Sequence, residues 1–542
     1  MLLCLPLAIL TAPAQPVQLT LGQNFVASTY ALNSTALPPD SNGTIGPQHF
    51  VEFINGSVSI YNRTNGVLMS RKTNLQFWAA AGLILSSDSA TSDPRVIYDS
   101  TTQRWFASQV DINATATDPT VYGNDFLLAV SATSDPRGPW HGVMFPADPD
   151  TSSFADFPTL GLDANAVYLS GDMYIGQTNP VGASLVSIPK ADLTNSTPTA
   201  ANRTWFGVMN YTNHGEVLQP AICFDGSVTG AVLGLGDIGY DSDPHSNVVF
   251  SVVQNGGTPT ASLSAATSIN VSPYVVPMND NLGAPNFNPT QPDGTTNIMG
   301  DDGRLSARVY AVGGVLYAVH NTEVNNRIAI QWFRINAATH ALLESGTIAD
   351  NNLDLFYPCI AANSNGVVVI ACNGSSINTF VSCYALAGVT INGVTQFGGL
   401  QLLQAGQVSY HGDDETYADL MGLPLSSRWG DYNSISVDPN DANRFWTIVM
   451  YPSDAANADV WSTQVTELVT TYRPALALSV TGNQAVVAWP GSATGYGLQA
   501  TTNLANASAW LTVTNLPVLT NNNFTVTLPL TNAAARFFRL KK

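Results

Sequence analysis

Alternating apolar and polar positions run through most of the chain, and one alternating segment recurs. It begins with Pro, has apolar residues at alternate positions and closes with Asp or Asn. Its copies are Pro94–Asp99, Pro158–Asp163, Pro220–Asp225, Pro358–Asn363 and, with Asn in place of Pro, Asn433–Asp438. A period of two puts every second side chain on one face, as in a half-buried strand, and the closing residue favours a turn. Each copy therefore predicts a strand that ends in a turn.

Two more alternating runs follow each copy. The second strands are expected at Trp105–Val110, Val167–Ser170, Val232–Leu235, Val367–Cys372 and Phe445–Tyr451, and the third at Phe126–Ala132, Ser184–Ile188, Val248–Val253, Phe380–Ala385 and Val460–Val465. Two degenerate units start near His49 and Ala307. Repeated antiparallel units without helical periodicity predict an all-β protein, a seven-bladed β-propeller. Six or eight blades also fit, and an array of β-sandwiches is the alternative.

The composition changes near residue 473. Residues 475–542 contain no Asp or Glu and four basic residues, and alternating runs at Ala485–Trp489, Tyr496–Ala500, Trp510–Val513 and Phe524–Leu528 predict a small separate β-sandwich. The expected domains are an N-terminal segment over 15–36, the propeller over 37–470 and the sandwich over 475–542.

The whole chain has 542 residues with 38 acidic and 19 basic side chains, a formal net charge of -19. Binding to nucleic acid or to an anionic membrane needs a basic surface, so neither is expected of this acidic chain. No run of 18 apolar residues follows the first residues, so no membrane span is expected. Met1–Pro16 is apolar and contains Ala12-Pro13-Ala14, which predicts a signal peptide over 1–14 and export; a buried N-terminal strand is the alternative.

Cysteine spacing excludes a zinc site. Apart from Cys4 the chain has Cys223, Cys359, Cys372 and Cys383, without CxxC or Cys/His spacing. The last three fall on neighbouring predicted strands, so either one cross-strand disulfide or buried free thiols would fit.

Three segments resemble secreted bacterial β-propellers of the broad sialidase-like superfamily. They are Pro38–Pro47 (PPDSNGTIGP), Ser92–Val96 (SDPRV) and Arg428–Tyr432 (RWGDY). The resemblance spans most of residues 36–470 and implies a propeller fold and export rather than one activity. The Asp-box of true sialidases, Ser-x-Asp-x-Gly-x-x-Trp, does not occur. The tail is similar to the fibronectin-III-like modules that close many exported proteins.

Charged and aromatic residues gather just before the predicted first strands. In a propeller those positions meet around one mouth of the channel, where the carboxylates and the exposed aromatic rings would receive a sugar or a cation such as calcium. The candidates are Asp40, Asp93, Asp156, Asp302 and Asp431, with Arg95, Arg304 and Arg428 to compensate charge and Trp429 and Tyr432 to stack. The alternative is that the Asp residues only cap turns.

Two weaker signals complete the candidates. His411 with Asp413 or Glu415 could supply an acid–base pair, although a solvated loop explains them equally. Asp40 and Asn42 resemble the start of a calcium loop, but the twelfth position is Val51, not an acid.

The favoured function is an exported binding or scaffold protein that recognises a polysaccharide or glycoconjugate at the channel mouth. A glycosidase or lyase that uses the mouth carboxylates is one alternative, and a platform for a protein partner is the other.

Overall fold

The computed structural model describes residues 17–541 apart from 87–88, 114–122, 151–152, 177–178, 237–243, 278–287, 297, 301, 414–426, 473, 492, 494, 521–522 and 530–535. The predicted signal peptide lies outside this part of the chain. Among the residues described, strands dominate, together with the short helices α1 (Asn74–Ala80), α2 (Lys190–Thr194) and α3 (Tyr211–His214) and the 3-10 turn η2 (Ala507–Ala509). The protein is all-β, and none of its described helices has the length and apolar character to cross a bilayer.

Antiparallel units of about four strands follow one another along the chain. The first has β2 (Asn42–Ile45), β3 (His49–Ile54), β4 (Ser57–Asn62) and β5 (Leu68–Thr73). The second has β6 (Ser89–Asp99), β7 (Arg104–Asn113), β8 (Asp125–Ser131) and β9 (Trp140–Pro146). The third has β10 (Phe154–Leu162), β11 (Ala166–Tyr174), β12 (Pro180–Pro189) and β13 (Thr204–Met209).

The later units keep the same order. The fourth has β14 (Glu216–Pro220), β16 (Ala231–Leu235), β17 (His245–Gln254), β18 (Ser262–Leu263) and β19 (Thr267–Tyr274), and β15 (Ile222–Cys223) follows β14 without joining this sheet. The fifth has β20 (Tyr310–Val312), β21 (Val315–Val324), β22 (Arg327–Asn336) and β23 (Leu342–Ile348). The sixth has β24 (Asp354–Ala362), β25 (Val367–Ser376), β26 (Thr379–Ile391), β27 (Val394–Phe397) and β28 (Gln401–Gln404).

The last unit joins the two ends of the large body. Its strands are β29 (Ser434–Val437), β30 (Arg444–Pro452), β31 (Trp461–Tyr472) and β1 (Val17–Thr29). β1 pairs antiparallel with β31 from Val17↔Tyr472 to Thr29↔Ser462. The sequence patterns did not assign a strand to this N-terminal segment.

The first strands of the units contact one another around a closed ring. β2 contacts β6, β6 contacts β10 and β10 contacts β14; β20 contacts β24, β24 contacts β29, and β29 contacts β2. β15 bridges the remaining gap by pairing in parallel with both β10 and β20. A ring of antiparallel units that closes on itself is the arrangement of a β-propeller.

A bulge interrupts the first strand in several units, and it explains the repeated Pro. The register shifts between Ser92 and Arg95, between Asp156 and Thr159, and between Phe356 and Cys359. Asp93, Phe157 and Tyr357 precede the Pro there, with φ of 59°, 50° and 47°. Pro has no N–H to give to a ladder, so it fits where the pairing is broken. In the fourth unit the bulge falls at Val217 (φ 43°), ahead of Pro220.

The closing Asp or Asn forms the predicted turn at the other end of these strands. Each side-chain oxygen accepts the backbone N–H two residues later, at 2.7–3.0 Å. We call this end of the ring the turn end, defined by Asp99, Asp163, Asp225, Asn363 and Asp438. The opposite end, where the strands begin, is the acidic end, defined by Asp40, Asp93, Asp156, Asp302 and Asp431.

Buried thiols occupy the core. Cys223, Cys359, Cys372 and Cys383 are all free and buried, which confirms the free-thiol alternative. Cys359 lies in the main apolar core with Ile360 and Ile370, and burial raises the pKa of its thiol to about 12.

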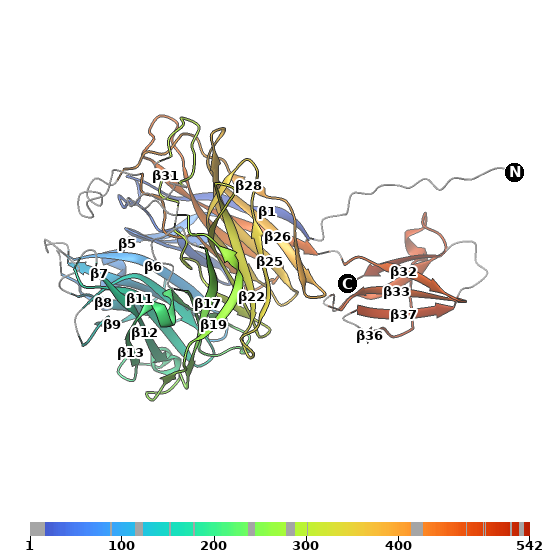
Figure 1. Ribbon diagram of the computed structural model, residues 1–542, viewed down its shortest axis with the longest axis horizontal. Helices are drawn as coiled ribbons and strands as arrows, with labels where there is room; N and C mark the ends of the chain where they lie inside the picture. The colour runs from blue at the N-terminus through green and yellow to red at the C-terminus, as the bar shows by residue number, and fades with distance from the viewer. Residues whose placement is uncertain are drawn as a thin grey trace.

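The C-terminal strands form two further sheets, which lie apart from the ring (Figure 1). One has the order β32 (Ala477–Thr481), β33 (Gln484–Pro490), β37 (Asn523–Pro529) and β36 (Val518–Thr520). The other has the order β35 (Leu511–Thr512), β34 (Gly497–Thr501) and β38 (Phe537–Lys541). Val487, Trp489, Leu498, Val526 and Leu528 form a small core of their own.

Candidate functional site

The aspartates of the acidic end form a buried layer and a solvent-facing layer, and the bulges decide to which layer each side chain belongs. Asp40 and Asp93 have positive φ (53° and 59°) and are only 1% and 6% exposed. Asp156 stands one residue before its bulge and is exposed, while Asp302 and Asp431 are half-buried. Successive side chains of a strand point to opposite sides, so a shift of one position changes which carboxylate meets solvent.

The buried carboxylates hold neighbouring units together. Asp93 Oδ2 accepts the backbone N–H of Phe157 in the next unit at 2.9 Å, and Asp40 Oδ1 accepts that of Asp431 in the last unit at 3.3 Å. Asn55 links the two, since its Nδ2 donates to Asp40 Oδ2 (2.9 Å) and its Oδ1 accepts the N–H of Asp93 (3.0 Å). These carboxylates therefore have a structural role, in which they accept hydrogen bonds from their own and from other units.

Crowding of these acids raises their pKa values. Burial is the main cause for Asp40, followed by the charges of Asp431 and Asp93 and a hydrogen bond with Asp93, which together raise its pKa well above the ordinary value. Burial and the charge of Asp431 raise the pKa of Asp93 as well. A carboxylate that accepts hydrogen bonds would normally titrate low, so burial and like charges held nearby must outweigh those bonds.

Asp156 is the carboxylate that meets solvent among these charges. The surrounding protein desolvates its carboxyl, and this effect, with the charge of Asp93 and, to a lesser degree, that of Asp431, raises the pKa to about 7 although Arg304 opposes the shift. Its side chain is nevertheless exposed, so a ligand can reach it. The charges of Asp40, Asp93, Asp156 and Asp431 therefore act on one another at this end of the ring.

Arginines neutralise the other solvent-facing acids. Arg428 binds Asp431 through two N–H groups at 2.8 and 3.1 Å, and Arg304 binds Asp302 in the same way at 2.9 and 3.1 Å. Arg304 Nη1 also lies 3.6 Å from Asp172 Oδ2. Paired forks of this kind fix the orientation of both partners. The acidic end therefore presents fixed donors beside fixed acceptors.

Arg95 is a structural residue. It is 2% exposed, its guanidinium lies 3.4 Å from the centroid of the Tyr432 ring, and it donates to the carbonyls of Pro158 (3.0 Å) and Ser306 (3.2 Å). This stack joins the second, third and last units beneath the solvent-facing layer.

The expectation that Trp429 and Tyr432 are exposed is wrong. They are 0% and 1% exposed. Trp429 packs edge-on against Tyr410 with ring centroids 4.8 Å apart, and the Tyr432 hydroxyl donates to Pro94 O at 3.1 Å. Large rings gain more by filling the core than by facing water. Neither ring is available to stack on a sugar.

His411 has a carboxylate partner that the sequence did not indicate. His411 Nε2 lies 2.7 Å from Asp293 Oδ2, a residue 118 positions away. Asp413 instead accepts the hydroxyl of Ser427 at 2.8 Å, and Glu415 falls outside the described residues. His411 therefore has a carboxylate partner, but not one of those expected.

The side-chain oxygens of Asp40 and Asn42, the weak calcium candidates, already accept hydrogen bonds from the protein. Both Asp40 oxygens accept hydrogen bonds, and Asn42 Oδ1 accepts from the Val96 N–H (3.0 Å) and from Arg308 Nη2 (2.5 Å). Within the described ranges no group of three His, Cys, Asp or Glu side chains is arranged to hold a metal ion.

Two site residues escaped the sequence patterns. Asn55 belongs to an Asn-Gly pair, which indicates only a hairpin turn. That pattern gives no sign that its side chain hydrogen-bonds both Asp40 and Asp93. Asp172 lies inside β11, is 2% exposed, and accepts the N–H of Val217 at 3.1 Å. Burial raises its pKa to about 6 against the opposing charge of Arg304. An acid inside an otherwise apolar strand was the signal available for Asp172.

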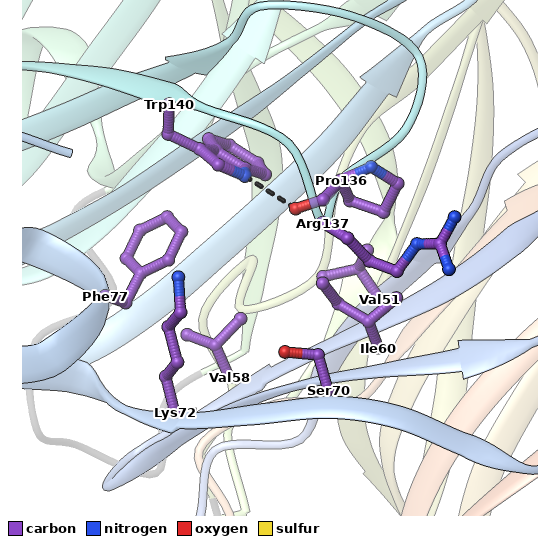
Figure 2. A pocket seen from close by; sticks show the side chains of 9 residues that line it. All are labelled: Val51, Val58, Ile60, Ser70, Lys72, Phe77, Pro136, Arg137 and Trp140. Atoms are coloured by element: carbon purple, nitrogen blue, oxygen red, sulfur yellow. Dashed lines mark hydrogen bonds between the residues drawn. The ribbon is translucent and has the colours of Figure 1, made fainter. Parts of the chain in front are cut away.

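A pocket between the first two units contains none of the predicted residues (Figure 2). Phe77 and Trp140 line it with ring centroids 5.1 Å apart, and the Trp140 indole donates to Pro136 O at 2.8 Å. Of its two cations, Arg137 is already bound by Asp135 at 2.7 Å. This apolar pocket offers no chemistry comparable to that of the acidic end.

Comparisons with known proteins give structural neighbours only. No family model and no curated protein matches the chain. An exo-β-1,3-galactanase from Phanerochaete chrysosporium, solved with galactose, aligns at 12% identity over 83% of this chain and 99% of its own, with a TM-score of 0.30. Drosophila Plexin A in complex with Semaphorin 1b aligns at 8% identity over 83% of this chain and 88% of its own, with a TM-score of 0.36.

A subtype N10 neuraminidase-like protein of A/little yellow-shouldered bat/Guatemala/060/2010 aligns at 11% identity over 62% of this chain and 91% of its own, with a TM-score of 0.25. All three scores lie below 0.5, so the fold assignment rests on the strand pairing described above, and no activity follows from these alignments.

Proposed function

We propose that the chain is an exported, secreted or cell-surface protein, built as a seven-bladed β-propeller with a fibronectin-III-like module, and that its acidic end binds the hydroxyls of a polysaccharide or glycoconjugate. The observation that carries the binding site is Asp156, an exposed carboxyl among arginine–carboxylate pairs. Arg304 with Asp302 and Arg428 with Asp431 place donors and acceptors around it. Adjacent sugar hydroxyls need both.

The buried aromatic rings make this a polar site. Without Trp429 or Tyr432 at the surface, affinity would come from hydrogen bonds, and water competes strongly for those. Weak binding to each sugar unit, summed over a repeating polymer, is therefore the expected mode.

Native gels cast with single polysaccharides test this proposal. Wild-type protein should be retarded in at least one gel, and Asp156→Asn should migrate as in a gel without polymer. Asp192→Asn on α2 is the matched control, because Asp192 lies near the turn end and its carboxylate accepts Asn202 Nδ2 there, at 2.9 Å. Retention that is equal in both variants would contradict the site, and no retardation by any polymer would contradict carbohydrate binding.

A glycosidase is the second candidate, and one observation favours it. Glycoside hydrolysis needs one carboxyl that keeps its proton and a second that is ionised. Asp156, with its pKa of about 7, has the first property, and Asp431, which Arg428 contacts at 2.8 Å, is the candidate for the second carboxyl. Release of reducing ends from a retarding polymer, lost in Asp156→Asn, would select the enzyme; intact polymer would select the binding protein.

A further inference from the structure

A second pocket lies at the turn end, between the second and third units. Arg104 at the start of β7, Ser131 at the end of β8 and His141 on β9 line one side. Thr194 at the end of α2, with Asn195 and Ser196 after it, lines the other. The first strands of the units run between this turn end and the acidic end, so this pocket is separate from the proposed carbohydrate site.

Donor groups line this pocket from both units. Arg104 uses one nitrogen on Ser131 O, at 3.1 Å, and its other N–H groups have no partner in the described part of the chain. Asn195 accepts the Thr197 N–H through Oδ1 (2.7 Å), which leaves its Nδ2 to donate. The Ser196 side chain and the His141 ring are exposed. A guanidinium fork with amide, hydroxyl and imidazole donors matches the oxygens of an anion.

The local charge contrasts with that of the whole molecule. The chain carries a net charge of -19, yet no described side chain that lines this pocket is acidic. Asp99, which caps the turn just before Arg104, is already bound by Lys190 at 2.9 Å. Arg104 is therefore not neutralised by a carboxylate of its own, and an anion from solution would supply the missing charge.

We propose that this pocket binds an oxyanion, either a free sulfate or carboxylate ion or the same group carried on a glycan. The Arg104 fork holds two oxygens, while Asn195, Ser196 and His141 complete the set of donors. The net negative charge of the chain repels anions at long range, so binding depends on these short contacts and on ionic strength.

Equilibrium dialysis of the full chain against radiolabelled sulfate at low ionic strength tests the proposal. Wild-type protein should bind one saturable sulfate. Arg104→Gln should lower the affinity at least tenfold, Arg104→Lys by less, and His141→Gln a fewfold. Arg137→Gln is the control, because Arg137 does not line this pocket and its guanidinium already donates to the carboxylate of Asp135. Unchanged thermal unfolding of each variant shows that it is folded.

Competition experiments distinguish a free anion from the same group carried on a glycan. Displacement of sulfate by a sulfated or uronate oligosaccharide at a lower concentration than free sulfate or acetate would assign the group to a glycan, and equal displacement would assign a free ion. Either result supports an oxyanion site. Absence of saturable binding, or equal affinity of Arg104→Gln and wild type, would overturn it.

Discussion

The two ends of the ring shift the pKa values of aspartates in opposite directions. At the turn end Asp225 accepts hydrogen bonds from Ser227 and Gly313, which overcome the effect of burial and lower its pKa to about 2. At the acidic end Asp156 is desolvated beside Asp93, and its pKa rises to about 7. Residue type and strand are comparable, so the difference lies in whether the nearest charged or polar groups are donors or other acids.

The kind of donor also differs between the ends. At the turn end Asp99 accepts the N–H of Thr101 in its own turn and the ammonium of Lys190 in the third unit. At the acidic end Asp40 and Asp93 accept backbone N–H groups from other units, those of Asp431 and Phe157. Both ends therefore link neighbouring units, but the turn end uses a buried ammonium to do so, whereas the acidic end leaves the Asp156 carboxyl exposed to a ligand.

The largest expected loss of unfolding free energy comes from removing one partner of the buried ion pair at the turn end. Lys190→Met leaves Asp99 buried with no cation, where the two side chains are 3% and 0% exposed. Loss of one partner of a buried pair costs about 3–5 kcal/mol of unfolding free energy. Urea unfolding at pH 7 measures it, with Lys190→Met/Asp99→Asn as control. The double variant should recover much of the loss; a single-variant loss below about 1 kcal/mol would contradict the pairing.

A smaller effect, of opposite sign at the two ends, appears in pH dependence. The pKa of Asp40 is raised on folding, so its contribution is full below the unfolded pKa and is lost as pH rises through the folded one. Asp40→Asn removes this slope, and its stability relative to wild type should increase from pH 5 to pH 9. The increase should be about 1.4 kcal/mol for every tenfold difference in proton affinity between the folded and unfolded carboxyl.

Asp225 behaves in the reverse sense. Its folded pKa is lowered to about 2, so its contribution is full above the unfolded pKa and is lost as pH falls towards 2. Asp225→Asn should therefore lie closest to wild type in acid and furthest below it at neutral pH. Urea midpoints across the pH range measure both variants, and parallel curves for variants and wild type would contradict the comparison.

The smallest expected effect concerns backbone strain. Gln103 in an exposed turn and Asp93 in its bulge both have positive φ, 55° and 59°. Gln103→Gly should raise stability by about 1 kcal/mol, because glycine adopts this conformation without steric cost. Asp93→Gly relieves the same strain but loses the bond to the Phe157 N–H, so it should destabilise. Thermal unfolding distinguishes them, and the same sign for both would contradict this account.

Sequence patterns reach local features of the molecule. The segment Pro94–Asp99 predicts both the strand and its turn, because alternation and Asx turns depend on residues only a few positions apart. The convergence of Asp93, Asp156 and Asp431 also follows from repetition, since equivalent positions of a ring share one end.

Long-range contacts are beyond such patterns. β1 pairs with a strand more than 430 positions away, and its own alternation does not name the partner. His411 pairs with Asp293, 118 positions away, while Asp413 accepts the Ser427 hydroxyl. Trp429 and Asp431 are two residues apart, yet only the tertiary packing decides that the ring is buried and the carboxylate half-buried.

Carbon-13 NMR of protein labelled at the aspartate carboxyl carbons tests the central claim most directly. A titration from pH 3 to pH 9 should show a carboxyl that titrates near pH 7 and disappears in Asp156→Asn, while the Asp225 carboxyl stays ionised down to about pH 2. A wild-type spectrum in which every aspartate titrates below about pH 5, as isolated carboxyls do, would contradict the claim that the acidic end concentrates charge around an accessible carboxyl.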